Sequence, residues 1–264
     1  MLEGRTALIT GATGGLGLEM ARRFHEAGAA VLLTGLGDEA EIAALDAALR
    51  RDGPGGEGAP VEIHPADAAR PEQLAALVAA FAGRGIAVDI LVNNAGVQHV
   101  SPIESFPAAA WDRLIAVNLS APFHLIRALV GGMKERGWGR IVNIASVHGL
   151  VGSPDKSAYV ASKHGLVGLT KAVALETAGT GVTCNVLCPG LLMTPLSASQ
   201  IAETGRRLNL SFEEATRRLL RDKQPSMQTI PLCEIAELAL HLCSGAASQM
   251  TGAAIPVDGA WTAQ

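Results

Sequence analysis

Short apolar segments rich in valine and isoleucine recur along this chain, and longer segments with an amphipathic helical pattern separate them. Strands that are apolar throughout are typical of a parallel sheet that helices cover on both faces, because neither face meets water. The crossovers between such strands are right-handed. The sequence therefore predicts an α/β fold with a doubly wound, parallel, seven-stranded sheet. The predicted strands cover residues 6–10, 30–34, 61–64, 89–93, 140–145, 183–187 and 254–257.

The alternation of strands and helices runs through most of the 264 residues, which predicts one domain over 1–264. The Gly- and Pro-rich segment 52–60 is expected to be a surface loop inside that domain. Residues 191–228 are the least regular part and predict a polar helical insertion that closes over a substrate as a lid. Arginines in this lid occur together with Glu213 and Glu214, which favours a solvated helix face over a basic partner surface.

Charge and cysteine usage argue against several classes of protein. The net charge of -4 comes from interspersed acidic and basic residues, so no basic stripe indicates nucleic-acid binding. The first residues lack the apolar stretch of a signal peptide, and no segment is expected to reach membrane-spanning length. The four cysteines lack a C-x-x-C spacing, and the seven histidines lack a metal-ligand spacing. We therefore expect reduced cysteines, no metal and no membrane association, in a cytoplasmic protein.

A glycine-rich segment, T-G-A-T-G-G-L-G at residues 10–17, follows the first predicted strand directly and opens a helical pattern at 18–24. Glycines let the backbone turn tightly and approach a pyrophosphate closely, and the helix N-terminus then faces its charge. A glycine-rich turn alone is weak evidence, but its place after the first strand of an α/β chain predicts a Rossmann-type dinucleotide site. The expected contacts are Gly11, Thr13, Gly15, Leu16 and Gly17.

The end of the second predicted strand, T-G-L-G-D at residues 34–38, indicates which nicotinamide dinucleotide is used. A ribose 2′-phosphate needs a nearby cation, and no Arg or Lys occurs between residues 31 and 49. A bare ribose hydroxyl needs only a hydrogen-bond acceptor, for which Asp38, beyond the strand tip, is the acidic candidate. The segment favours NAD over NADP as the cofactor.

Tyr159 and Lys163 stand four residues apart in S-A-Y-V-A-S-K at 157–163, after Ser146 at the end of an apolar strand. Residues at i and i+4 share a helix face, so the Lys163 ammonium is expected beside the Tyr159 phenol. A neighbouring positive charge lowers the pKa of a phenol from about 10, which makes it a usable acid and base near pH 7. Tyr159 is the only tyrosine of the chain, and this setting favours catalysis over packing. The trio predicts a hydride-transfer site in which Ser146 holds the reacting oxygen.

These motifs together resemble the short-chain dehydrogenase/reductase family, and the resemblance covers essentially the whole chain. Four family motifs occur in the expected order and spacing, which makes the match highly specific. They are T-G-x-x-x-G-x-G at 10–17, N-N-A-G at 93–96, the pair Tyr159 and Lys163, and P-G at 189–190.

The resemblance also implies roles that spacing alone does not assign. Asp67 is expected to contact the adenine, and Lys163 to hold the nicotinamide ribose as well as to act on Tyr159. Asn118 matches the family's fourth catalytic position, where it carries a proton relay through water. The implied cofactor residues are Leu36, Asp67, Asn94, Ala95, Gly96, Val117, Tyr159, Lys163, Pro189, Gly190, Leu192 and Thr194.

Longer strings resemble one subfamily, the bacterial D-3-hydroxybutyrate dehydrogenases, and lie at 93–100, 146–153, 222–226 and 257–264. The resemblance implies reversible, NAD-dependent oxidation of (R)-3-hydroxybutyrate to acetoacetate by a homotetramer. Two departures matter: Leu191 stands where tryptophan is common, which leaves a roomier pocket, and Leu36 stands where an aromatic residue usually covers the adenosine. The implied substrate residues are Gln98, Ser146, His148, Lys156, Tyr159, Gln200 and Trp261, the last beside the substrate methyl group.

A substrate carboxylate that enters a closed site needs a cation, and Lys156 is the candidate, with two glutamines and a histidine as neutral donors. Another member of the family, acting on a longer 3-hydroxy acid, a 3-ketoacyl group, a sugar or a steroid, is an open alternative. A non-catalytic nicotinamide-binding sensor is a second alternative. Its expected mark is loss of the catalytic tyrosine, lysine or serine, and all three are present.

Overall fold

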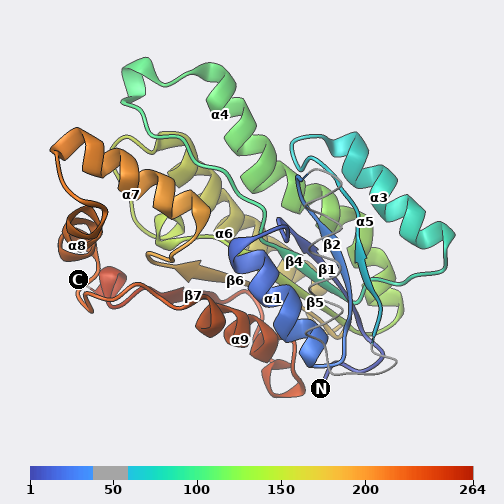
Figure 1. The fold of residues 1–264 in the computed structure, drawn as a ribbon. Coiled ribbons are helices and arrows are strands. Elements are labelled where there is room, and N and C mark those ends of the chain that lie inside the picture. The colour runs from blue at the N-terminus through green and yellow to red at the C-terminus, as the bar shows by residue number, and fades with distance from the viewer. Residues whose placement is uncertain (38–58, 264) are drawn as a thin grey trace.

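The computed structural model describes residues 1–37 and 59–263. Within that part, seven strands form one parallel sheet in the order β3-β2-β1-β4-β5-β6-β7 (Figure 1), which confirms the predicted doubly wound fold. Because the chain returns past β1 after β3, the strand order reverses between β1 and β4. Doubly wound sheets bind ligands at such a reversal, beyond the carboxyl ends of the strands. The strands are β1 (Thr6–Thr10), β2 (Ala30–Thr34), β3 (Val61–Ile63), β4 (Ile90–Asn93), β5 (Gly139–Ile144), β6 (Val182–Pro189) and β7 (Ala254–Val257).

The strand bounds lie close to the predicted ones. β1, β2 and β7 have both predicted ends. β6 extends beyond the predicted 183–187 because it pairs with β5 along one edge and with β7 along the other. Asp38 and the part of the expected loop at 52–58 lie outside the described residues.

Helices cover both faces of the sheet. α1 and α9 pack together over one core that contains Ile9 and Leu33, and α3, α5 and α6 cover the opposite core, which contains Leu8 and Leu91. Successive side chains of a strand point to opposite faces, so neighbours Leu8 and Ile9 belong to different cores. The helices are α1 (Gly15–Glu26), α3 (Pro71–Gly83), α4 (Ala108–Ile115), α5 (Ala121–Glu135), α6 (Ser157–Thr177), α7 (Pro195–Leu208), α8 (Phe212–Lys223) and α9 (Leu232–Leu242), with 3₁₀ turns at Ile103–Ser105, Val147–Gly149, Gly245–Ala247 and Trp261–Ala263.

A π-helical segment, Ala116–Ser120, joins α4 and α5 into one continuous helix, Ala108–Glu135. Among the described residues this helix of 28 residues is long and apolar enough to cross a membrane, by length and composition alone. The prediction that no segment reaches membrane-spanning length was therefore wrong. A core helix of a soluble protein passes the same test, and Leu125, Ile126 and Met133 of α5 pack into the core beneath the sheet. Packing thus accounts for part of the apolar composition, since 39% of the apolar window is buried.

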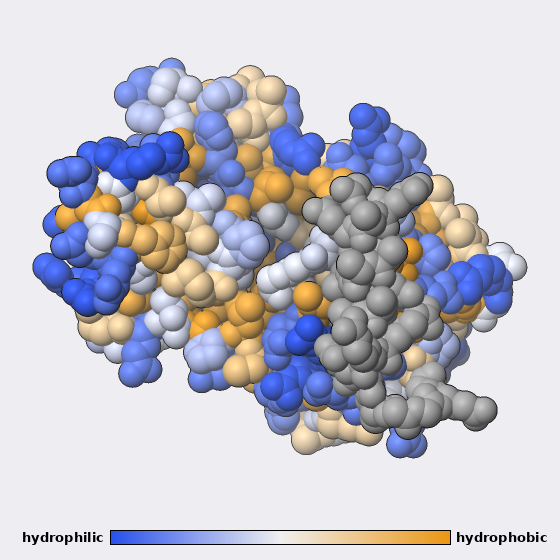
Figure 2. Space-filling view, in the orientation of Figure 1, coloured by the Kyte–Doolittle hydropathy of each residue, from blue (hydrophilic) through white to orange (hydrophobic). Residues whose placement is uncertain are grey.

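Two helices, α7 and α8, occupy the segment predicted as a lid and lie together at the left of Figure 1. Each begins with a capping box, in which the N-cap side chain and the third helical residue satisfy each other's backbone amides. Figure 2 shows hydrophilic residues along the outer left of the molecule, where these helices lie. Three of the exposed arginines pair with acidic residues of their own helices, which supports a solvated face rather than a basic partner surface. The pairs are Arg206 with Glu203, Arg217 with Glu213, and Arg218 with Asp222.

Candidate active site

The glycine-rich turn is tightly packed on its inner side and open on its outer side. Gly11 has a φ of +63°, and a Cβ at this position would lie 2.8 Å from Cα of Ala95. A Cβ at Gly14, in contrast, would meet no atom within 4 Å. The first turn of α1 holds no acidic residue. Open space at a helix N-terminus without a competing carboxylate fits the pyrophosphate of a dinucleotide.

Asn94 fixes this turn from the neighbouring strand. Its Nδ2 donates to the carbonyl oxygens of Thr10 at 2.9 Å and Gly11 at 3.0 Å. Its backbone N–H donates to Oγ1 of Thr10 at 3.0 Å. Asn94 therefore supports the turn as well as facing the site.

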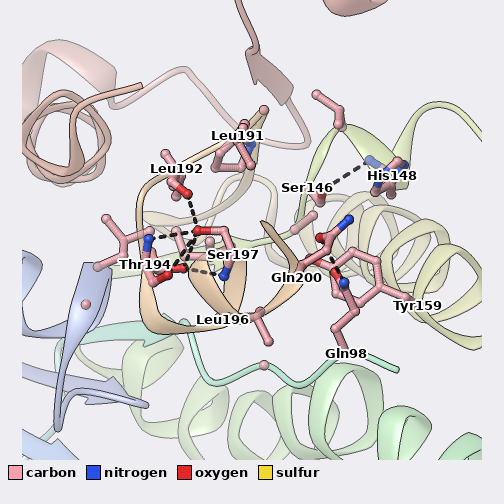
Figure 3. A pocket seen from close by; sticks show the side chains of 18 of the residues that line it. Gln98, Ser146, His148, Tyr159, Leu191, Leu192, Thr194, Leu196, Ser197 and Gln200 are labelled. Carbon is pink, nitrogen blue, oxygen red and sulfur yellow. Dashed lines mark hydrogen bonds between the residues drawn. The ribbon is translucent and has the colours of Figure 1, made fainter. Parts of the chain in front are cut away.

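A cavity of about 390 Å³ opens at the carboxyl ends of the central strands, with the lid helices over it (Figure 3). The glycine turn forms one part of its wall, and side chains from β5, α6 and the lid form the rest. The predicted residues that line it are Gly11, Thr13, Gly15, Leu16, Asn94, Ala95, Gly96, Gln98, Ser146, His148, Lys156, Tyr159, Lys163, Pro189, Gly190, Leu192, Thr194, Gln200 and Trp261.

Five predicted site residues lie outside the cavity lining. Leu36 is 60% exposed after the end of β2. Asp67 has a carboxylate oxygen 3.7 Å from Nη1 of Arg113, in an ion pair. Gly17 lies in α1 beneath the turn, and Val117 and Asn118 are buried in the π-helical segment. Their contacts with a dinucleotide stay predictions.

Tyr159, Lys163 and Ser146 face one cavity. Tyr159 and Lys163 lie one helical turn apart on α6, and Nζ of Lys163 is 5.7 Å from the centre of the tyrosine ring. The Lys163 ammonium also donates to the carbonyl oxygen of Ile144 at 2.9 Å, which fixes its position. Ser146 follows β5, lines the same cavity, and is close enough to Tyr159 to act on the pKa of its phenol. Three polar groups thus surround one point where a substrate oxygen could exchange a proton.

Burial is the largest influence on the pKa values of Tyr159 and Lys163. Desolvation raises the pKa of Tyr159, and the hydrogen bond with Ser146 offsets only part of this effect. Burial also lowers the pKa of Lys163 to about 8. In the protein alone the pKa of the phenol is therefore raised, not lowered as predicted, and loss of water around the phenol is the largest cause. The positive nicotinamide ring of an oxidised dinucleotide would add a charge that favours the phenolate.

Asn118 owes its position to the π-helical segment. Its Nδ2 donates to the carbonyl oxygen of Val97 at 3.0 Å and to Oγ of Ser162 at 3.1 Å, and its Oδ1 accepts from the Val97 N–H at 2.9 Å. A Cβ at Gly96 would lie 3.6 Å from both Oδ1 of Asn118 and Nζ of Lys163, so the two groups are neighbours. π-Helical turns occur frequently at functional sites. The predicted proton relay is compatible with this arrangement.

Another part of the cavity wall carries positive charge. Lys156, at the start of α6, is only 6% exposed, and burial followed by the proximity of Lys223 lowers its pKa to about 8. The pKa of His148 falls to about 3, first through burial and then through Lys156 and Lys223, so the imidazole is neutral at pH 7. Nδ1 of His148 is buried without a hydrogen-bond partner among the described residues. The Lys156 ammonium thus supplies a positive charge for an incoming carboxylate, and Nδ1 of the neighbouring imidazole is open to a ligand.

Gln98 and Gln200 meet across the cavity. Nε2 of Gln98, in the loop after β4, donates to Oε1 of Gln200 on α7 at 3.0 Å (Figure 3). The pair therefore links the sheet edge to the lid. Each amide keeps further hydrogen-bonding capacity for a ligand.

Several cavity residues were not assigned to the site from the sequence, and Lys223, Gln224 and Ser197 are the polar ones among them. Oγ of Ser197 donates to the carbonyl oxygen of Leu192 at 2.5 Å and shapes the loop before α7 (Figure 3). Lys223 and Gln224 belong to the string at 222–226 that carries part of the subfamily resemblance. That string was the available signal for them.

Comparison with known proteins agrees with this geometry. A family model described as short chain dehydrogenase matches residues 5–205. The chain belongs to the short chain dehydrogenase family. This short chain dehydrogenase is 48% identical over 260 residues to the D-beta-hydroxybutyrate dehydrogenase of Rhizobium meliloti, which covers 98% of the chain and 99% of that relative. It is 46% identical over 264 residues to the protein of the same name from Cupriavidus necator, with 100% of both chains covered.

The fold of this short chain dehydrogenase is similar to that of a variant of actinorhodin polyketide ketoreductase solved with NADPH. The TM-score is 0.89 at 37% identity, and the match covers 97% of each chain. The relatives and the family make this short chain dehydrogenase an oxidoreductase. Both resemblances stated from the sequence, to the family and to its hydroxybutyrate subfamily, are confirmed.

Proposed function

We propose that this short chain dehydrogenase oxidises (R)-3-hydroxybutyrate to acetoacetate, reversibly, with NAD as the hydride acceptor. The observation that carries the proposal is a single cavity in which Tyr159, Ser146 and Lys163 lie near a cationic wall that contains Lys156. A secondary alcohol and a carboxylate on one small molecule need such a combination. The names of the two full-length relatives support the same substrate.

Different residues bind the cofactor and transfer the proton in the proposed reaction. The glycine turn and Asn94 would hold the dinucleotide, which would supply the hydride acceptor for the alcohol carbon. Tyr159, as phenolate, accepts the hydroxyl proton while Ser146 hydrogen-bonds the same oxygen. Lys163 stabilises the phenolate, and with Asn118 and water it returns the proton to solvent.

The choice of NAD rests on the end of β2. No cation occurs between residues 31 and 49, so a 2′-phosphate finds no partner there. The part described, Thr34 to Gly37, offers backbone groups and the exposed side chain of Leu36. We further propose a single domain over 1–264 with a lid at 191–228, on the order of its elements. Charge and the spacing of cysteines and histidines support a cytoplasmic protein without nucleic-acid, metal or membrane partners, and the resemblance stated above supports a homotetramer.

A longer 3-hydroxy acid is the second candidate substrate. Leu191 lines the cavity at the position where tryptophan is common in the subfamily, and a leucine fills less space. Reduction of a 3-ketoacyl group, a sugar or a steroid with NADPH is opposed by the cationic wall and by the absence of a cation after β2.

One assay tests the proposal directly. We expect the purified enzyme to reduce NAD with (R)-3-hydroxybutyrate, at least about tenfold faster at limiting substrate than with the (S) enantiomer or with NADP, because a factor of ten corresponds to only ~1.4 kcal/mol. Absorbance of the reduced cofactor follows the reaction. A five-carbon and a six-carbon (R)-3-hydroxy acid measure the extra space at Leu191. Faster turnover with NADP, or none with any 3-hydroxy acid, would reject the proposal.

Lys156→Ala is expected to raise KM for 3-hydroxybutyrate roughly 10- to 100-fold, because a charge-assisted hydrogen bond contributes about 1.5–3 kcal/mol. KM for the methyl ester of the same acid should change much less, since the ester carries no charge. Lys171→Ala, which removes an exposed lysine of the same helix, is the matched control. Equal effects of Lys156→Ala on acid and ester would remove the carboxylate assignment.

A further inference from the structure

A second lysine faces the cationic wall of the cavity. Lys223 is the last residue of α8, and its half-buried side chain lines the cavity. Its Nζ donates to Oγ of Ser153 at 3.3 Å and lies 5.3 Å from the ring centre of Trp261. The Trp261 ring in turn lies 5.3 Å from the ring of His148. Lys223 therefore stands beside the groups that the proposed function assigns to the substrate.

The end of α8 is held by the buried side chain of Gln224. Gln224, directly after Lys223, is 1% exposed, and its Oε1 accepts from the backbone N–H of Leu191 at 2.9 Å. Its Nε2 donates to the carbonyl oxygen of Gln228. A Cβ at Gly190 would collide with Oε1 of Gln224, so the side chain is packed directly on the turn after β6. The backbone at Lys223 is thus tied to both ends of the lid segment and to the turn after β6.

The charges around the two lysines are not balanced by the protein. Lys156 and Lys223 repel each other, and among the described residues neither ammonium forms a salt bridge with a carboxylate. Asp222 attracts Lys223 but is exposed and pairs with Arg218, 2.9 Å away. The other groups nearby do not supply an anion: His148 is neutral, and Asp258 is held by the backbone and hydroxyl of Thr262. Two partly desolvated cations without an anion predict that the ligand supplies one.

We propose that Lys223 is the second cation of the carboxylate subsite, so that the acid group of the substrate binds between the ammonium groups of Lys156 and Lys223. The proposal rests on the proposed function and deepens it by naming a residue that selects an acid over an uncharged alcohol. Ser153 and the Trp261 ring hold the Lys223 side chain in place for this contact.

Binding of a carboxylate should therefore draw a proton into the protein. Lys156 has a pKa of about 8 in the free protein, so at pH 8 a substantial fraction is neutral. A bound carboxylate favours the charged form and raises this pKa, which makes binding take up a proton and weaken as pH rises above 8. Removal of Lys223 relieves the repulsion, so the pKa of Lys156 should rise and the loss of affinity should begin at a higher pH.

Lys223→Met tests the proposal, with Arg221→Met as the control that removes an equal charge from an exposed position of the same helix. For Lys223→Met we expect a roughly tenfold or larger rise in KM for 3-hydroxybutyrate, with kcat and the kinetics of the methyl ester nearly unchanged. Lys223→Arg should keep most of the preference for the acid. The pH at which KM begins to rise should move upward in Lys223→Met but not in Arg221→Met. An equal rise in KM for the acid and the ester, or no rise in KM for the acid, would overturn the proposal.

A binding measurement separates this inference from the proposed function. Calorimetry of acetoacetate binding to the enzyme saturated with NAD, a pair that cannot react, is run at pH 8 in two buffers of different ionisation enthalpy. The wild type should take up a fraction of a proton, and Lys223→Met a smaller one. If acetoacetate binds in this way while 3-hydroxybutyrate is not oxidised, the proposed function fails and the carboxylate subsite stands. If oxidation proceeds but proton uptake is the same in both proteins, the subsite proposal fails alone.

Discussion

Tyr159→Phe is expected to lower kcat for alcohol oxidation by roughly 10²- to 10⁴-fold, the usual range for loss of a general acid or base. The substitution removes the one hydroxyl that can accept the substrate proton next to Ser146. The ring itself stays, and with it the packing against Leu114 and the edge contact with His148 at 6.0 Å between ring centres. Fold and cofactor affinity should therefore be preserved.

Three measurements check this expectation. Single-turnover absorbance of the reduced cofactor gives the chemical step, titration of the protein with NAD gives cofactor affinity, and urea unfolding gives stability. A drop in turnover with the other two quantities unchanged identifies Tyr159 as the group that moves the proton. Turnover close to the wild-type rate would refute the assignment, and equal losses in all three would indicate a structural role.

The sequence predicted the sheet well because its signal is local. Strands that are buried on both faces, such as β4 and β5, can be recognised in the sequence as continuous apolar segments. Their ends lie within one residue of the predicted ends. The glycine turn and the i, i+4 pair on α6 are equally local, and both reach the same cavity because the strands are parallel.

What the sequence could not give depends on contacts between distant segments. The raised pKa of Tyr159 comes from burial by several elements, and the spacing of Tyr159 and Lys163 contains no information on that desolvation. Gln98 and Gln200 are 102 residues apart, so their hydrogen bond is invisible before folding. Lys223 reads as one more lysine on a charged helix until its neighbours in the cavity are known.

Gly17→Ala is the second change with a large expected effect, and the structure separates it from a neighbouring glycine that looks equivalent in the sequence. A Cβ at Gly17 would lie 2.6 Å from Nδ2 of Asn94 and 2.9 Å from Cα of Ala12, and closer still to the carbonyl oxygen of Gly11. Two of these three atoms are backbone, so the turn itself must move. Overpacking of this kind costs about 1–3 kcal/mol of the free energy of unfolding.

The same displacement should lower the affinity for the dinucleotide roughly tenfold or more, because Asn94 holds the turn through its hydrogen bonds to Thr10 and Gly11. A factor of ten in affinity corresponds to only ~1.4 kcal/mol. Urea unfolding and NAD titration measure the two effects. Gly14→Ala is the stability control, because its φ of 179° suits any residue and its Cβ would meet no protein atom within 4 Å. It should unfold within about 0.5 kcal/mol of the wild type, as surface substitutions do. If Gly17→Ala were as stable as Gly14→Ala and bound NAD normally, close packing would not be what fixes this turn, and the coupling between Asn94 and the cofactor site would have to be abandoned.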